Sequence, residues 1–85
     1  MLEFKFDTQL LIEKTTNDLD EDKIEKYILD NFKGDCLICC GDETLIKIHF
    51  HTNEPGKVVD YCSTLGDVYD VVIENMERQS NGKKG

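Results

Sequence analysis

The spacing of apolar residues restricts the fold of this chain most, because it changes between the period of a strand and that of a helix. Residues 2–13 alternate apolar and polar side chains with a period of two, which predicts a strand with one buried face. Residues 20–33 carry apolar side chains at helical spacing, with acidic residues in the first turn and Gly34 as a stop. This second segment is therefore predicted to be a helix.

The second half of the chain changes period in the same way. The apolar run 36–40 and the alternating run 44–52 predict two strands joined by a polar turn of hairpin length. A short helix is expected from Pro55 to Gly66, because proline suits a first helical turn and glycine a helix end. Residues 67–76 then predict a fourth strand.

The resulting order is strand, helix, strand, strand, helix, strand. This order predicts an α+β fold of the ferredoxin-like split βαβ type (βαββαβ), with a four-stranded antiparallel sheet and both helices on one face. The other face of the sheet would remain open. With 85 residues in total, we expect a single domain over residues 1–79 and a polar, glycine-containing, disordered tail over residues 80–85.

The charge of the chain excludes some classes of partner. Lysine and arginine number 10 against 18 aspartate and glutamate, and the net charge of -8 would repel the phosphates of nucleic acid and of anionic lipids. No apolar run is long enough to span a membrane, and the first ten residues do not resemble a secretory signal. We therefore expect a cytoplasmic protein without a nucleic-acid partner or a membrane span.

The four cysteines allow two interpretations. Cys36 and Cys39 have the spacing of half a zinc knuckle, but no second pair completes a four-ligand set. The favoured interpretation is that Cys36, Cys39, Cys40 and Cys62 are free thiols that act as small core hydrophobes. A disulfide framework is less favoured still in a chain without a secretory signal.

Both histidines of the chain lie in the predicted third strand, on the face opposite its apolar residues. The apolar set, which must face the helices, is Ile46, Ile48 and Phe50. Because side chains alternate along a strand, His49 and His51 then point to the open face. The same argument in the first strand places Asp7 on that face.

The first and third strands are central neighbours in this fold, so these three side chains can meet. If residue 13 lies beside residue 44, Asp7 falls opposite residue 50, between the two histidines. Two imidazoles and a carboxylate, with a fourth position for water or substrate, suit zinc or a similar divalent ion and leave room for Lewis-acid chemistry. Asp7, His49 and His51 are the candidate metal ligands, and His49 and His51 the candidate catalytic residues. The alternative is a pair of ordinary solvated histidines.

The open face is also predicted to carry an apolar patch. On the parity that buries Tyr69, Val71 and Ile73 in the fourth strand, the exposed apolar residues are Leu11, Leu45, Val68 and Val72. A patch of this kind usually contacts another chain or domain. We therefore expect a homodimer or a docked neighbouring domain.

Two motifs resemble a known family. They are the pattern HxHTNxPG at residues 49–56 and IENM at residues 73–76, followed by Gln79. With the remainder of residues 4–79, they resemble the middle domain of bacterial fatty acid kinases of the FakA, dihydroxyacetone-kinase-like or YloV type. The resemblance extends over nearly the whole chain.

The resemblance implies a fragment of a three-domain kinase. An N-terminal domain would bind ATP and Mg²⁺, and a C-terminal domain would be related to DegV-type fatty-acid-binding proteins. The kinase would phosphorylate a fatty acid presented by a separate DegV-type carrier, giving an acyl phosphate. The middle domain is associated in this family with dimerisation and with a metal site made by the H-x-H pair and a first-strand residue. Many members carry cysteine where this chain has Asp7, a harder ligand, so the identity of the metal stays open.

The chain alone is expected to be inactive, because neither a phosphate-binding glycine loop nor a magnesium-binding aspartate cluster is evident in it. A function of another class also fits the sequence. An ACT-like regulatory or purely dimerising module would have the same fold, with no metal and no catalytic role.

Overall fold

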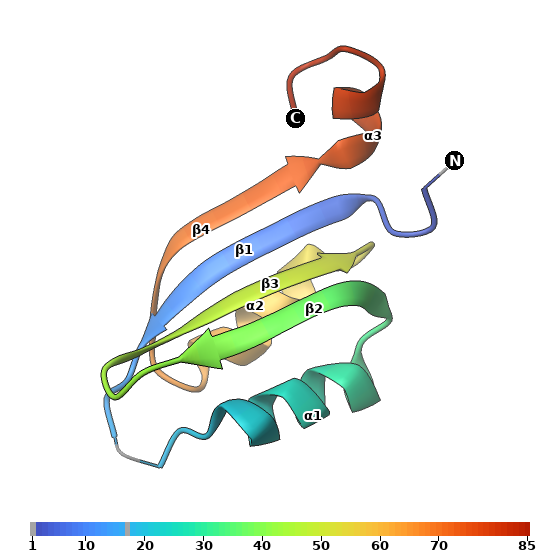
Figure 1. The fold of residues 1–85 in the computed structure, drawn as a ribbon. Helices are drawn as coiled ribbons and strands as arrows, with labels where there is room; N and C mark the ends of the chain where they lie inside the picture. Colours follow the sequence, from blue (N-terminus) through green and yellow to red (C-terminus); the bar gives the residue numbers. More distant parts are fainter. Residues whose placement is uncertain (1, 17) are drawn as a thin grey trace.

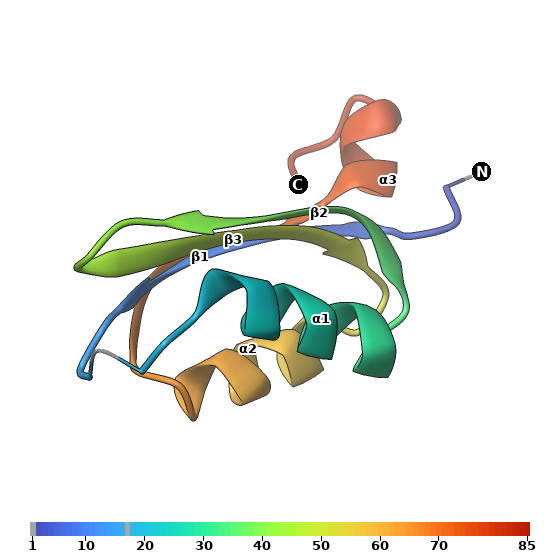
Figure 2. The ribbon, with the colours of Figure 1, turned by 60° about the horizontal axis from the view of Figure 1, so that its bottom comes forward.

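A computed structural model describes residues 2–16 and 18–85. The elements, in chain order, are β1 (Phe6–Glu13), α1 (Glu21–Asn31), β2 (Gly34–Gly41), β3 (Leu45–Thr52), α2 (Pro55–Ser63), β4 (Asp67–Asn75) and α3 (Met76–Ser80). The strands form one antiparallel sheet in the order β2-β3-β1-β4 (Figure 1). Helices α1 and α2 lie together on one face of it (Figure 2). The predicted α+β, ferredoxin-like arrangement is confirmed, including the central position of β1 and β3.

The hydrophobic core lies between the sheet and the two helices. Its buried apolar residues are Leu10, Ile12, Ile24, Ile28, Ile46, Ile48, Phe50, Val58 and Cys62. Every second residue of β3 from Ile46 to Phe50 belongs to this set, as the alternation predicts. The opposite parity of β3 therefore leaves His49 and His51 on the open face.

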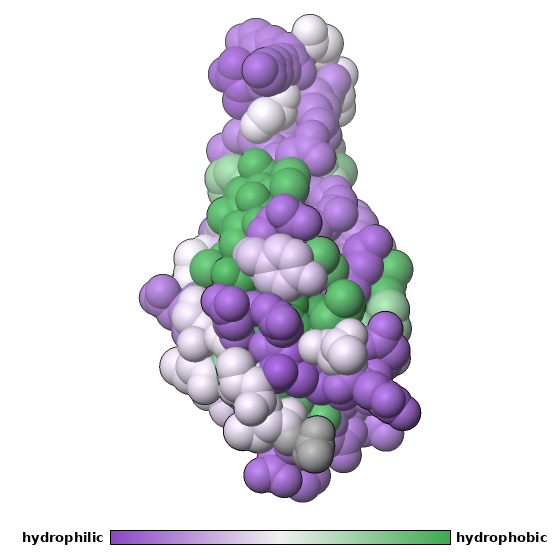
Figure 3. All heavy atoms as spheres, turned by 90° about the vertical axis from the view of Figure 1, so that its left-hand side faces the viewer, coloured by the Kyte–Doolittle hydropathy of each residue, from purple (hydrophilic) through white to green (hydrophobic). Residues whose placement is uncertain are grey.

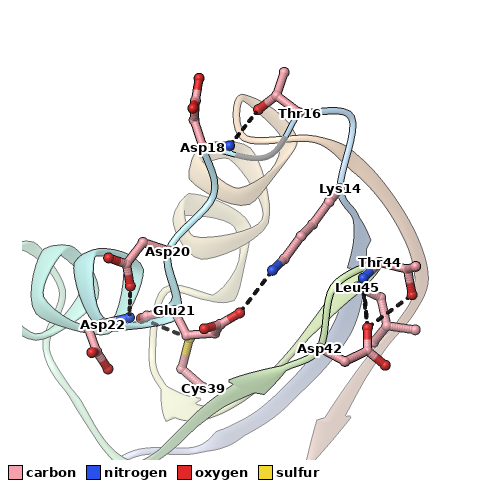
Figure 4. A network of polar contacts seen from close by, with 10 residues as sticks. All are labelled: Lys14, Thr16, Asp18, Asp20, Glu21, Asp22, Cys39, Asp42, Thr44 and Leu45. Carbon is pink, nitrogen blue, oxygen red and sulfur yellow. Dashed lines mark hydrogen bonds and ion pairs between the residues drawn. The ribbon is translucent and has the colours of Figure 1, made fainter.

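Helix α1 begins one residue later than predicted and ends two residues earlier. Asp20 is its N-cap, and the Asp20 carboxylate accepts a hydrogen bond from the Asp22 backbone amide at 2.9 Å (Figure 4). An ion pair of 3.1 Å between Lys14 Nζ and Glu21 Oε1 connects the end of β1 to this first helical turn (Figure 4). The segment between β1 and α1 is thereby held near the edge of the sheet.

The β2–β3 turn is fixed by one carboxylate. Asp42 Oδ1 accepts hydrogen bonds from the backbone amides of Thr44 (2.8 Å) and Leu45 (3.0 Å) and from the Thr44 hydroxyl (2.9 Å), as Figure 4 shows. These hydrogen bonds stabilise the charged carboxylate and lower the pKa of Asp42. The hairpin that sequence predicts is confirmed.

The four cysteines are free thiols, as predicted, but only two of them pack inward. Cys62 is buried, and burial raises its pKa to about 12. Cys39 packs against the core and donates a hydrogen bond of 3.4 Å to the Glu21 carbonyl (Figure 4); burial, with nearby Glu25, raises its pKa to about 12. Cys36 and Cys40 are exposed, so the prediction that all four are core hydrophobes is wrong for this pair.

The predicted pairing of β1 with β3 is wrong by one residue. Glu13 pairs with Leu45 instead of residue 44, and Asp7 therefore pairs directly with His51 instead of residue 50. Direct pairing puts both side chains on the same face of the sheet, whereas the assumed pairing would have put Asp7 opposite a core residue. The correction strengthens the contact between Asp7 and the histidines.

The side-chain parity predicted for β4 is wrong at its start. Val68 pairs with the buried Ile12 and packs against the core, whereas Tyr69 pairs with Leu11 on the open face. A bulge with Asp70 at a φ of 51° then shifts the register, and Val72 pairs with Gln9 on the open face as predicted. Tyr69, Val71 and Ile73, which were expected to be buried, are 39–43% exposed.

A short third helix, α3, follows β4 and was not predicted. Asn75 is its N-cap, and its side chain accepts a hydrogen bond of 3.0 Å from the Arg78 amide. Residues 81–85 are exposed and turn back, so that the Gly85 carbonyl accepts a hydrogen bond of 3.3 Å from the Asn75 amide. This end of the molecule is hydrophilic (Figure 3), and the disorder expected for residues 80–85 stays a prediction. Among the described residues, no helix is long and apolar enough to cross a membrane.

Candidate metal centre

Three side chains from the two central strands meet on the open face. Asp7 lies near the start of β1, and His49 and His51 lie in the second half of β3. Because the strands are antiparallel, the start of β1 lies beside the end of β3, and the 7–51 pairing brings all three onto neighbouring positions. Each is only 19–25% exposed, so the group is set into the surface.

The ligating atoms of this group converge on one point. The Nε2 atoms of His49 and His51 are 3.2 Å apart, and Asp7 Oδ1 lies 3.2 Å from the first and 3.9 Å from the second. Ligand bonds of about 2.0–2.2 Å to a zinc ion require nitrogen and oxygen atoms at separations of roughly this size. The three residues that sequence predicts as ligands are therefore brought together.

The hydrogen bonding of the group also fits a cation. Asp7 Oδ1 is buried and has no hydrogen-bond partner among residues 2–16 and 18–85, although a buried carboxylate oxygen normally has one. The two facing Nε2 atoms can share at most one proton between them, so at least one presents a lone pair. A divalent ion would satisfy the carboxylate oxygen and both lone pairs at once.

Neighbouring residues hold the orientation of the ligands. Gln9 Nε2 donates a hydrogen bond of 3.3 Å to Asp7 Oδ2, which leaves Oδ1 turned toward the histidines. On the other side, Asp35 Oδ1 lies 3.5 Å from Nδ1 of His51. Asp7 and His51 thus each have a polar partner on the atom that faces away from the group.

Sequence reasoning missed Asp35. It precedes the predicted strand 36–40, but it belongs to β2, where it pairs with His51 on the open face. The signal was the hairpin itself, because counting back from the turn at Asp42 brings this part of β2 beside His51. A bulge between Asp35 and Ile38 makes that count wrong by one residue.

Comparison with known proteins gives relatives that are much longer than this chain. Protein YloV of Bacillus subtilis (strain 168) is 36% identical over 80 residues, which cover 92% of this chain and 14% of YloV. Uncharacterised proteins of Staphylococcus aureus strains USA300 and NCTC 8325 are each 41% identical over 46 residues, which cover 54% of this chain and 8% of theirs. The chain therefore spans only a small part of these relatives.

The family comparison covers almost the whole chain. Residues 3–83 match the family described as the FakA-like middle domain of fatty acid kinase. The match includes every strand of the sheet and all three residues of the candidate metal centre. This chain belongs to the FakA-like middle-domain family of fatty acid kinases.

Proposed function

We propose that this chain is the metal-binding and dimerising middle domain of a cytoplasmic fatty acid kinase. The parent protein would use ATP to phosphorylate fatty acids carried by a DegV-type binding protein. The family assignment supports the kinase context. The observation that carries the metal-binding role is the convergence of Asp7, His49 and His51, with a buried carboxylate oxygen that has no other partner among the described residues.

Asp7, His49 and His51 would hold a divalent ion, with zinc as the first candidate. Two imidazoles and one carboxylate are a common protein donor set for zinc, and three protein ligands leave a fourth position for water or substrate. When bound, such an ion supplies Lewis-acid polarisation of an oxygen at that position. His49 and His51 are then the candidate catalytic residues, because they touch the ion directly.

Metal analysis of protein purified without a histidine tag tests this role. We expect about one equivalent of zinc or another transition metal in the wild-type chain, and almost none after simultaneous replacement of His49 and His51 with alanine. Replacement of Asp22, an exposed acid on α1, serves as the control and should leave the metal content unchanged. Wild-type protein without metal after incubation with zinc would instead favour the ACT-like or purely dimerising module.

Dimerisation would use the open face of the sheet. Ile38 (53%), Val72 (45%) and Tyr69 (39%) are the large apolar side chains exposed there. Figure 3 shows hydrophobic residues gathered below the hydrophilic C-terminal end, at the height of β4. A second copy of this chain, related by a two-fold axis, would cover them.

The ATP and Mg²⁺ sites would belong to another part of the parent protein. The 85-residue chain is expected neither to bind nor to hydrolyse ATP, whereas a full-length protein supplied with its fatty-acid carrier should consume ATP. Equilibrium binding of a fluorescent ATP analogue to both proteins measures this. Saturable binding by the 85-residue chain would contradict the assignment of the nucleotide site to a separate domain.

A further inference from the structure

A second group of ligating side chains adjoins the candidate metal centre on its β2 side. Asp35, Cys36 and His51 each offer a ligand atom within 4.8 Å of the others. Asp35 Oδ1 faces Nδ1 of His51 at 3.5 Å, whereas Asp7 and His49 face Nε2 of the same ring. The two ring nitrogens of His51 therefore point to two different groups.

The bulge in β2 is what brings Cys36 to this group. Asp35 pairs with His51 and Ile38 with His49, so β2 has one residue more than β3 in this interval. Strict alternation from Asp35 would send Cys36 toward the helices, as it sends Cys39. Instead Cys36 adopts a φ of 54°, rare for a residue other than glycine, and is exposed beside Asp35. Bulges commonly redirect one side chain in this way.

The donor chemistry of this group differs from that of Asp7, His49 and His51. It adds a thiol, and a thiolate is a softer ligand than a carboxylate oxygen, preferred by zinc and other soft divalent ions. Asp35 and Cys36 are both exposed, which gives an ion direct access from solvent. Cys40, the other exposed cysteine, pairs instead with Lys47, whose positive charge disfavours a cation there.

We propose that Asp35, Cys36 and Nδ1 of His51 form a second site for a soft divalent cation, next to the first. On binding, the Cys36 thiol loses its proton to solvent and the resulting thiolate coordinates the ion. When both sites are loaded, His51 bridges them as an imidazolate, and its remaining N–H proton also leaves to solvent. The site goes beyond the proposed function, because it can be loaded whether or not Asp7 and His49 hold an ion.

Asp35 has one competing role. It can accept a hydrogen bond from Nδ1–H of His51 and so only position that ring for the first site, as carboxylates commonly do for metal-bound histidines. In that case Nδ1 carries a proton and Cys36 remains an unligated thiol. The two roles differ in whether the sulfur atom of Cys36 coordinates an ion, which can be observed directly.

Titration of the 85-residue chain with Co²⁺ tests the site, because cobalt bound to a thiolate has a charge-transfer absorption in the near ultraviolet. We expect this absorption to rise and saturate in the wild-type chain, to be lost in Cys36→Ser and to be retained in the matched control Cys40→Ser. Circular dichroism of each variant checks that the fold is kept. Absence of the absorption in wild type, or its persistence in Cys36→Ser, would overturn the proposal.

The Asp7→Ala variant separates this site from the proposed function. The thiolate absorption should persist in Asp7→Ala, even though that variant removes a ligand of the first site. If the wild-type chain lacked zinc at the first site but still gave the absorption, the proposed function would fail while the second site stood. Loss of the absorption in Asp7→Ala would show that no independent site exists at Cys36.

Discussion

Among single residues, Asp7 best distinguishes a metal site from a pair of ordinary surface histidines. Its Oδ1 atom lies 3.2 Å from His49 Nε2 and is buried without a hydrogen-bond partner among the described residues. Asp7→Ala should weaken zinc binding by more than the roughly 10- to 100-fold typical for loss of an outer partner. Gln9→Ala, which removes only the hydrogen bond to Asp7 Oδ2, should have the smaller effect.

Competition titrations with a zinc-sensitive dye measure both variants. Asp7→Cys should keep the site and shift its preference toward zinc, since a thiolate is the softer ligand. Binding by wild type should be weaker at about pH 5.5 than at about pH 7.5, because a protonated imidazole cannot coordinate. Equal affinity in wild type and Asp7→Ala, or no change with pH, would leave His49 and His51 as surface histidines.

Two buried threonines give a matched pair for the free energy of unfolding. The Thr8 hydroxyl is buried with no hydrogen-bond partner among the described residues, whereas the Thr52 hydroxyl donates to the Lys33 carbonyl at 2.8 Å and accepts from the Glu54 amide at 3.2 Å. Thr8→Val should therefore stabilise the chain by about 1 kcal/mol, and Thr52→Val should destabilise it by about 1–3 kcal/mol. Urea unfolding followed by circular dichroism gives both values. Destabilisation by Thr8→Val would mean that its hydroxyl has a partner, such as a bound water.

At the level of elements, the start of β2 depends on a glycine that permits close approach. A Cβ atom at Gly34 would overlap the His51 carbonyl oxygen and the Phe50 ring, whereas a Cβ at Gly56 in α2 would meet nothing within 4 Å. Gly34→Ala should cost about 1–3 kcal/mol of stability and weaken metal binding, since it displaces the strand that carries His51. Gly56→Ala should instead stabilise α2 by about 0.5–1 kcal/mol.

The Gly34→Ala and Gly56→Ala variants need both thermal unfolding and zinc titration. The two measurements distinguish a general loss of stability from a local displacement of β3. Unchanged zinc affinity in folded Gly34→Ala would show that β3 keeps its position when β2 is pushed away.

The order of the elements and the faces of β1 and β3 could be predicted because their alternation is unbroken. Ile46, Ile48 and Phe50 are fully buried, so the open-face position of His49 follows directly from sequence. Glu13 could not be paired correctly, because the length of the β2–β3 turn does not determine how β1 lies beside β3. The approach of Asp7 to the histidines was predictable only as a neighbourhood.

The two bulges could not be predicted, because neither has the glycine that usually marks one. Cys36 and Asp70 adopt φ values of 54° and 51° without a sequence signal for left-handed backbone. The bulge at Asp70 puts Val68 in the core and Tyr69 on the open face, and the bulge at Cys36 puts that thiol beside His51. The parts of the open face that sequence misassigned are therefore those next to a bulge.

For the whole molecule, the open face and the net charge act in opposite directions on self-association. The exposed apolar residues favour dimerisation, whereas two copies that each carry a charge of -8 repel one another. Salt screens this repulsion, since the screening length falls from about 30 Å at 0.01 M to about 10 Å at 0.1 M. We therefore expect the dimer to form more readily as salt is raised.

Val72→Glu tests whether the open face forms that dimer. It places a charge in the apolar patch beside Gln9, and it should raise the dimer dissociation constant at least tenfold because an unpaired carboxylate would be buried in the interface. Leu29→Glu adds the same charge on α1, where Leu29 is 57% exposed on the opposite side of the molecule, and should leave the dissociation constant within a few-fold of wild type. Sedimentation equilibrium at about 0.05 and 0.5 M salt measures all three proteins. Equal weakening by both substitutions would attribute the effect to net charge alone, and a wild-type chain that stays monomeric at the higher salt and high protein concentration would contradict self-association through this face.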